Sequence, residues 1–183
     1  MIEVRWHGRG GQGGVTSAEL LAKAAYKDGY KGVQGFPYFG AERRGAPVRA
    51  FTRISDEPIN VRSQVYEPDI VTVLDPTIID LVDVSEGLKD GGKVIINTQK
   101  EPDNLGIERG RIYTFDGTGI ALKLGLLVSG LPVVNTPALG AFSKATGLVK
   151  LETVQEVIEE NWPGKVGKRN AEGAAMAYKD CGE

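Results

Sequence analysis

The stretch IEVRWHGRGGQGG, residues 2–14, indicates the fold more clearly than any other part of the chain. Apolar side chains at Ile2, Val4 and Trp6 alternate with charged ones, which is the pattern of a half-buried β-strand. The glycine-dense run that follows predicts a tight turn, and from Val15 the apolar residues recur at helical spacing. A strand, a glycine turn and a helix in this order indicate the first unit of an α/β domain.

Strand and helix patterns continue to alternate along most of the chain. Further strands are expected at residues 33–36, 48–54, 59–61, 70–74, 93–97 and 112–115. Further helices are expected at residues 77–84, 118–128, 137–148, 151–161 and 171–179. The pattern predicts a single α/β domain over residues 1–183, with a mainly parallel sheet and helices on both faces. Residues 48–61 are expected to form a small antiparallel insertion.

Length, charge and cysteine content exclude several classes of protein. The 183 residues suit one domain, and the net charge of -2 comes without a basic block for nucleic acid. No apolar run approaches the roughly 18 residues needed to span a membrane, and the first residues lack the apolar core of a signal peptide. A single cysteine forms no internal disulfide, so a cytoplasmic protein is expected.

The glycine turn fits the pattern G-x-G-x-x-G between a strand and a helix. Glycines let a backbone approach a ligand closely, and free amides at a helix start attract phosphate. The candidate binding residues are therefore Gly8, Arg9, Gly10, Gly11, Gln12 and Gly13. A second interpretation is that the glycines only allow tight packing or contact with another chain.

A dinucleotide site is disfavoured by the sequence after the next expected strand. Such a site places an acidic residue about 20 positions beyond the turn to bind the ribose. The corresponding stretch, residues 33–36, reads VQGF and contains no carboxylate. A free-standing NAD-binding module is thus the weaker alternative.

Three stretches resemble the gamma subunits of pyruvate:ferredoxin oxidoreductases. They are HGRGGQGGVTSAELLAKAA (7–25), GFPYFGAERRGAPVRAFTRI (35–54) and NTPALGAFSKATGLVKLETV (135–154). The segment WPGKVGKRNAEGAAMAY (162–178) is also similar, so the resemblance covers nearly the whole chain. The substrate remains open between pyruvate and, as the alternative, a branched-chain 2-oxoacid.

The resemblance implies a subunit that works with alpha, beta and delta subunits. Such a complex oxidatively decarboxylates a 2-oxoacid with coenzyme A and passes the electrons to ferredoxin. Thiamine diphosphate, magnesium and [4Fe–4S] clusters belong to the other subunits. One cysteine is too few for a cluster, which needs about four, and no thiamine diphosphate motif is present, so we expect no cofactor bound by this chain alone.

The resemblance also suggests a role for this chain next to coenzyme A. The phosphates of coenzyme A suit the glycine turn and the pair Arg43 and Arg44, because arginine binds phosphate through two parallel hydrogen bonds. The same arginines are equally suited to ion pairs with a neighbouring subunit. An assembly scaffold that touches no ligand is the remaining alternative.

Several other residues are expected to be structural. The aromatic residues of the second stretch are expected to anchor an interface or a local core. The one histidine is expected to be a structural residue whose hydrogen bonds are satisfied. Asp75 is expected at a strand end, where it serves an ordinary turn. Cys181 is expected to be exposed and without a functional role. These residues are Phe36, Tyr38, Phe39, His7, Asp75 and Cys181.

Overall fold

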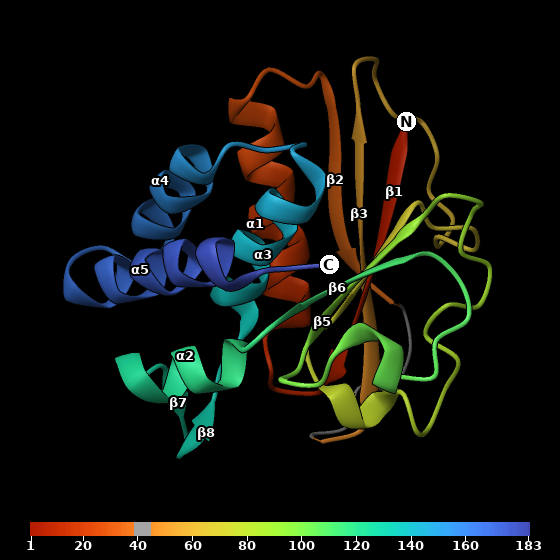
Figure 1. Ribbon diagram of the computed structural model, residues 1–183. Helices are drawn as coiled ribbons and strands as arrows, with labels where there is room; N and C mark the ends of the chain where they lie inside the picture. The colour runs from red at the N-terminus through yellow and green to blue at the C-terminus, as the bar shows by residue number, and fades with distance from the viewer. Residues whose placement is uncertain (39–44) are drawn as a thin grey trace.

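The computed structural model describes residues 1–38 and 45–183 of the chain. Their main feature is one six-stranded sheet with the strand order β2-β3-β1-β4-β5-β6 (Figure 1). The strands are β1 (Ile2–Arg9), β2 (Gly32–Pro37), β3 (Pro47–Ser55), β4 (Ile70–Val73), β5 (Lys93–Asn97), β6 (Arg111–Phe115), β7 (Leu127–Val128) and β8 (Leu131–Pro132). The helices are α1 (Gly14–Lys27), α2 (Gly117–Leu124), α3 (Asn135–Thr146), α4 (Leu151–Asn161) and α5 (Lys165–Asp180), with the 3-10 helices η1 (Pro76–Ile78) and η2 (Pro102–Asn104).

The sheet is parallel on one side of β1 and antiparallel on the other. Strands β1, β4, β5 and β6 are parallel, whereas β3 pairs antiparallel with both β1 and β2. The expected α/β domain with a mainly parallel sheet is therefore confirmed. The antiparallel part differs in detail, because β2 is the partner of β3 and residues 59–61 lie outside any strand.

The five α-helices of the described residues lie on the same side of the sheet (Figure 1). The even-numbered side chains of β1 point into this layer and join its large apolar cluster. Trp6 is fully buried there, stacks on Phe142 of α3 and donates a hydrogen bond from Nε1 to Thr52 Oγ1 at 3.0 Å. The alternation that predicted β1 thus decides which side chains face the helices.

The second face of the sheet is covered by 3-10 helices and loops, and this corrects the expectation of helices on both faces. Residues 77–84, expected as an α-helix, form η1 and a series of turns instead. The Asp83 carboxylate accepts hydrogen bonds from the backbone N–H and the hydroxyl of Ser85. Such local bonds offer the backbone an alternative to helix formation. A smaller apolar cluster that includes Val71, Val94 and Ile96 is buried under this cover.

The parallel strands end at one edge of the sheet, and this edge positions the candidate site. The glycine turn follows β1, Asp75 follows β4 and Asn97 is the last residue of β5. Ligand sites of parallel sheets open at the carboxyl ends of the strands. No helix in residues 1–38 or 45–183 has both the length and the apolar content to cross a membrane.

Candidate functional site

A crevice of about 840 Å³ opens at the carboxyl edge of the sheet. Its floor is formed by the ends of β1, β4 and β5, and Arg9–Gln12 of the glycine turn lie on one side. The start of α2 and the β7-β8 hairpin close the other side. Its size and its place in the sheet are typical of a small-molecule site. We call it the crevice below.

An ion pair joins the glycine turn to the end of β4. Arg9 Nε lies 3.1 Å from Asp75 Oδ2, while Arg9 Nη2 donates to Thr77 Oγ1 at 2.7 Å. Arg9 Nη1 donates to the carbonyl of Gly45 at 3.0 Å. All three guanidinium nitrogens therefore bind groups of the chain itself, so Arg9 acts as a clamp in this structure.

Asp75 is the centre of this clamp. Its Oδ2 also accepts from Gln12 Nε2 at 2.9 Å, and its Oδ1 accepts from the backbone and the hydroxyl of Thr77. Burial acts to raise the pKa of Asp75, but hydrogen bonds from Thr77 and Gln12 and the charge of Arg9 hold it below its ordinary value. The carboxylate is thus ionised and balances the arginine. The sequence identified Asp75 as a strand-end residue but not this clamp.

The glycines of the turn have different roles. Gly13 has a φ of 81°, and a Cβ there would lie 2.6 Å from Asn135 Nδ2, so the first residue of α3 covers the start of α1. Ser17 Oγ reinforces this contact by donating to the Asn135 carbonyl at 3.3 Å. Gly8 packs tightly against Leu74. The packing interpretation therefore fits Gly8 and Gly13.

Gly11 is the open position of the turn. It has a φ of 94°, and a Cβ placed on it would meet nothing within 4 Å. Gly10 and Gln12, its neighbours, line the crevice with it. A ligand in the crevice would therefore approach the turn at residues 10–12 and not at the start of α1.

The opposite wall of the crevice is apolar and comes from the β7-β8 hairpin. Val128, Leu131 and Pro132 line it, and Val128 and Leu131 remain 58% and 65% exposed. The turn residues Ser129 and Gly130 both have positive φ, as required by a tight two-residue hairpin. The expected helix 118–128 instead ends at Leu124, because Gly125 adopts a left-handed cap. The hairpin was not predicted.

An amide–hydroxyl pair completes the floor of the crevice. Asn97 Nδ2 donates to the Leu74 carbonyl at 2.8 Å and to Thr118 Oγ1 at 3.0 Å, while the Thr118 N–H donates to Asn97 Oδ1. These bonds fix β4, β5 and α2 relative to one another. Thr77, Asn97 and Thr118 were not predicted as site residues, although each stands at a strand end or a helix start.

The remaining predicted ligand residues, Arg43 and Arg44, lie outside the described residues, as does Phe39. The next residue in the chain, Gly45, lines the crevice. Its N–H donates a hydrogen bond to the Gly10 carbonyl at 3.1 Å, and the Gly10 N–H donates to the Ala46 carbonyl at 2.9 Å. Phe36 packs against Phe51, as expected for a local core.

His7 and Cys181 are both buried. Burial lowers the pKa of His7 to about 3, and the charges of Arg5 and Arg49 act in the same direction. The ring is therefore neutral at physiological pH, and its Nε2 has no hydrogen-bond partner among the described residues, contrary to the expectation of a satisfied histidine. Cys181 is 6% exposed, which corrects the expectation of an exposed thiol, because Gly182 pairs with Thr114 and holds the chain end on the sheet.

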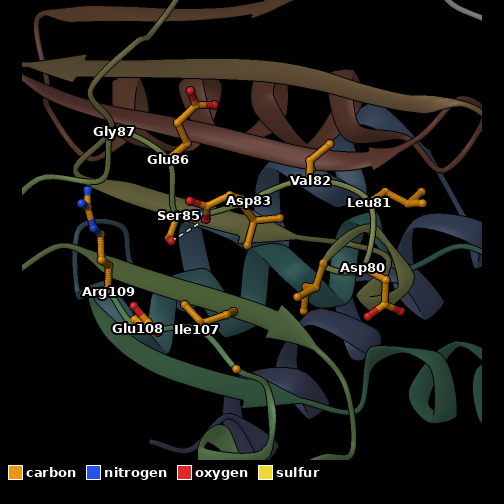
Figure 2. Close-up of a pocket in the computed structure, with 13 residues that line it drawn as sticks. Asp80, Leu81, Val82, Asp83, Ser85, Glu86, Gly87, Ile107, Glu108 and Arg109 are labelled. Atoms are coloured by element: carbon orange, nitrogen blue, oxygen red, sulfur yellow. Dashed lines mark hydrogen bonds between the residues drawn. The ribbon is translucent and has the colours of Figure 1, made fainter.

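A second cavity of about 690 Å³ lies among the loops that cover the other face of the sheet (Figure 2). Four carboxylates and one arginine are its charged lining residues: Asp80, Asp83, Glu86, Glu108 and Arg109. We call it the acidic hollow. Among the described residues, no group of three or more His, Cys, Asp or Glu side chains is arranged to hold a metal ion.

The strand order also bears on dinucleotide binding. In the dinucleotide fold the second strand lies beside the first and supplies the ribose ligand. Here β3 separates β1 from β2, so the end of β2 is two strands away from the glycine turn. This arrangement is a second reason against an NAD site, in addition to the missing carboxylate.

The sequence matches the family described as pyruvate ferredoxin/flavodoxin oxidoreductase over residues 3–179. It is 57% identical to the pyruvate/ketoisovalerate oxidoreductases common subunit gamma of Thermococcus kodakarensis, covering 97% of this chain and 96% of the relative. It is 55% identical to the pyruvate synthase subunit PorC of Methanothermobacter marburgensis, covering 98% and 97%.

The fold is likewise similar to that of a solved relative. The crystal structure of pyruvate oxidoreductase subunit PORC from Thermotoga maritima superposes with a TM-score of 0.84 at 37% identity. The match covers 100% of this chain and 98% of that one. Sequence and fold therefore agree over the full length.

Proposed function

The chain belongs to the pyruvate ferredoxin/flavodoxin oxidoreductase family, and we propose that it works as the gamma subunit of a pyruvate enzyme. The observation that carries the proposal is the identity of 57% and 55% with gamma and PorC subunits across almost the whole of each chain. The complete enzyme would convert pyruvate and coenzyme A to acetyl-CoA and CO2 and would reduce ferredoxin. The partners of this chain would be the alpha, beta and delta subunits.

The redox chemistry would take place on those other subunits. There thiamine diphosphate, anchored by magnesium, would supply the decarboxylation chemistry, and [4Fe–4S] clusters would carry the electrons. A cluster needs about four thiolates, and this chain has only the buried Cys181. The contribution of the gamma subunit would be to shape a binding surface.

That surface would be the place where coenzyme A enters. The proposal gives Gly8, Arg9, Gly10, Gly11, Gln12 and Gly13, with Arg43 and Arg44, a role in framing the coenzyme A site. Two features support it: residues 9–12 line an open crevice, and Gly45, the residue after Arg44, lines the same crevice. Gly8 and Gly13 would act indirectly, by packing the turn in place.

Copurification tests the assignment as a subunit. A tagged form of this chain, expressed in its own cells, is expected to isolate together with two larger chains and a small iron–sulfur chain. The isolated complex should oxidise pyruvate in the presence of coenzyme A and ferredoxin. The chain expressed by itself should contain no stoichiometric iron and should be inactive. An active, iron-containing single chain would refute the proposal.

A second candidate function is a gamma subunit shared by two enzymes. The Thermococcus kodakarensis relative is named as common to pyruvate and ketoisovalerate oxidoreductases. This chain is 57% identical to it and 55% identical to the PorC subunit of Methanothermobacter marburgensis, so sequence identity does not separate the two functions. Mass spectrometry of the copurified chains separates the two. One set of alpha and beta chains supports a pyruvate-only subunit, and two sets support a shared one.

A further inference from the structure

The end of α2 and the β7-β8 hairpin expose a group of large apolar side chains. Their exposed fractions are 59% for Leu122, 46% for Leu127, 58% for Val128 and 65% for Leu131. We call these four residues the hairpin patch. In Figure 1 the hairpin projects from the molecule below α2. Exposed apolar side chains that gather on one part of a protein mark a contact with another molecule, whereas single ones are ordinary.

The hairpin is anchored at its base by Leu126. This residue is buried, its N–H donates to the Ala121 carbonyl at 2.8 Å, and its carbonyl accepts from the Val133 N–H at 2.9 Å. Beyond the anchor each strand has two residues, and a two-stranded hairpin by itself is marginally stable in water. The hairpin would therefore be stabilised by a surface that covers its exposed side chains.

The side chain of Leu122 points to the hairpin side of α2. The helix lies between α5 and the hairpin and contacts both (Figure 1). Leu124 faces α5, since a Cβ built on Gly173 would lie 3.6 Å from its Cδ1. Residues two apart on a helix point roughly 200° apart, so Leu122 faces away from α5. Leu122 therefore extends the apolar surface of the hairpin.

A small molecule in the crevice would not cover this surface. Val128 and Leu131 line the crevice, whereas Leu122 and Leu127 are not among its lining residues. A ligand bound in the crevice would thus leave these two leucines exposed to water. A surface that covers all four residues has to be larger, as the surface of another protein is.

Basic side chains border the hairpin patch. Lys123 lies in the last turn of α2, and Arg169 of α5 reaches the end of this helix, where its Nη1 would lie 3.6 Å from a Cβ built on Gly125. Lys165 lies one turn before Arg169 on the same face of α5, and all three basic residues are exposed. Glu172, in the next turn, is also exposed. The border is therefore mainly positive and complementary to a surface with carboxylates.

We infer that the hairpin patch is a docking surface for a neighbouring subunit of the enzyme, which covers it with apolar side chains bordered by carboxylates. A second copy of this chain would fit poorly, because in a two-fold contact the same surface meets itself and the basic residues would face one another. A different chain can supply the opposite charge. This inference rests on the proposed role as a gamma subunit and adds the surface and the chemistry by which the chain joins the complex.

The test measures how strongly the larger chains bind to a tagged form of this chain expressed in its own cells. Leu122→Asp and Leu127→Asp place a charge in the patch at positions outside the lining of the crevice. Both side chains are exposed, so the substitutions leave the fold intact. Leu81→Asp is the matched control, because Leu81 is 57% exposed and lies in the loops over the second face of the sheet.

Each of the two patch variants is expected to bind the larger chains about tenfold more weakly, because it places a charge among the apolar contacts of an interface. Leu81→Asp should resemble wild type. Arg169→Glu should also weaken binding, and more at low salt than at high salt, since exposed charges are screened by salt. Arg169→Lys, which keeps the positive charge, should bind the larger chains as wild type does.

Other results would overturn the inference in different ways. If both patch variants bind the larger chains as wild type does, the neighbouring subunit docks elsewhere, and the proposed subunit role stands because the complex still forms. An equal loss in Leu81→Asp would contradict the assignment of this surface. Unchanged or stronger binding in Arg169→Glu would contradict a partner surface bordered by carboxylates. If the wild-type chain isolates without partner chains, the proposed function fails together with the inference.

Discussion

The crevice and the acidic hollow are of similar size but differ in charge and construction. Among the described lining residues, the charged ones of the crevice are Arg9 and Asp75, which form an ion pair, whereas those of the hollow are four carboxylates and Arg109. A polyanion such as coenzyme A would be repelled from the hollow. The balance of charges in each cavity, and not its volume, therefore decides which of the two suits an anionic ligand.

The two cavities also depend on different parts of the fold. The crevice is built from strand ends, a glycine turn and a hairpin, so its shape is fixed by the sheet. The hollow is built from loops that are attached to the sheet by Arg5, whose Nη2 donates to the carbonyls of Val84 and Glu86 at 3.0 and 2.6 Å. We therefore interpret the hollow as part of the cover of the second face of the sheet and not as a ligand site.

The largest effect is expected for Arg5→Ala. The side chain is 3% exposed and holds residues 84–86 on the sheet, so its loss leaves two carbonyls without a donor and a cavity beneath them. Denaturant unfolding should show a loss of roughly 2–3 kcal/mol. Arg109→Ala, at the exposed arginine of the same hollow, is the control and should change stability by less than about 0.5 kcal/mol. Equal effects would contradict the assignment of Arg5 as the anchor.

Acid is expected to destabilise the protein through His7, which lies on the same face of β1 as Arg5. Its folded pKa of about 3 lies below the ordinary value of 6.5, so between these values the unfolded chain binds a proton that the folded chain does not. The contribution to stability is therefore full above about pH 6.5 and falls as the pH drops toward 3. Between pH 6.5 and about pH 5 the loss should be on the order of 1–2 kcal/mol.

His7→Gln tests this slope. The variant should lose the pH dependence between pH 5 and 6.5, whatever its absolute stability, as measured by urea unfolding at several pH values. An unchanged slope would show that His7 titrates with an ordinary pKa in the folded protein.

Asp75→Ala is expected to reduce stability less than Arg5→Ala does. Its main effect should be on the binding of coenzyme A. The substitution removes the acceptor of Arg9, Gln12 and Thr77 and should cost about 1 kcal/mol, because the site is partly exposed to water. In the intact complex the KM for coenzyme A should rise, since the turn loses its anchor. Asp83→Ala is the matched control in the hollow and should leave this KM unchanged. A rise for both would remove the functional distinction between the cavities.

The smallest effect is expected for Glu86→Gln. This side chain is exposed in the hollow, and its neutralisation should change stability by less than about 0.5 kcal/mol. The KM for coenzyme A should be the same as in wild type. A fall in that KM would mean that the acidic hollow repels the bound ligand and lies near it.

The sequence predicted the framework of this fold because the pattern of β1 and the apolar runs at β4 and β5 are local and strong. It also located the crevice, since the glycine turn and Asp75 each follow a strand. The pairing of β2 with β3 was missed because strand partners are chosen by long-range contacts. The helix expected at residues 77–84 was wrong, because the apolar spacing gives no sign of the Asp83–Ser85 hydrogen bonds that favour turns there.

The hairpin was the most important omission at the site. Its strands have two residues each, too short for an alternation to show, and only the Ser129-Gly130 dipeptide marked the turn. The pairing of Arg9 with Asp75 was equally hidden, because the two residues are 66 positions apart and meet only when β1 and β4 align. The sequence therefore suggested that Arg9 could bind a phosphate. In the structure its guanidinium nitrogens bind Asp75, Gly45 and Thr77 instead.

Hydrogen exchange of the intact complex, with and without coenzyme A, tests the central claim most directly. Coenzyme A should slow exchange in peptides that cover residues 9–12 and 127–134, which line the crevice. Peptides from residues 79–87 and 106–109, which line the acidic hollow, should exchange at the same rate in both states. Protection of the hollow, or none in the crevice, would contradict the account.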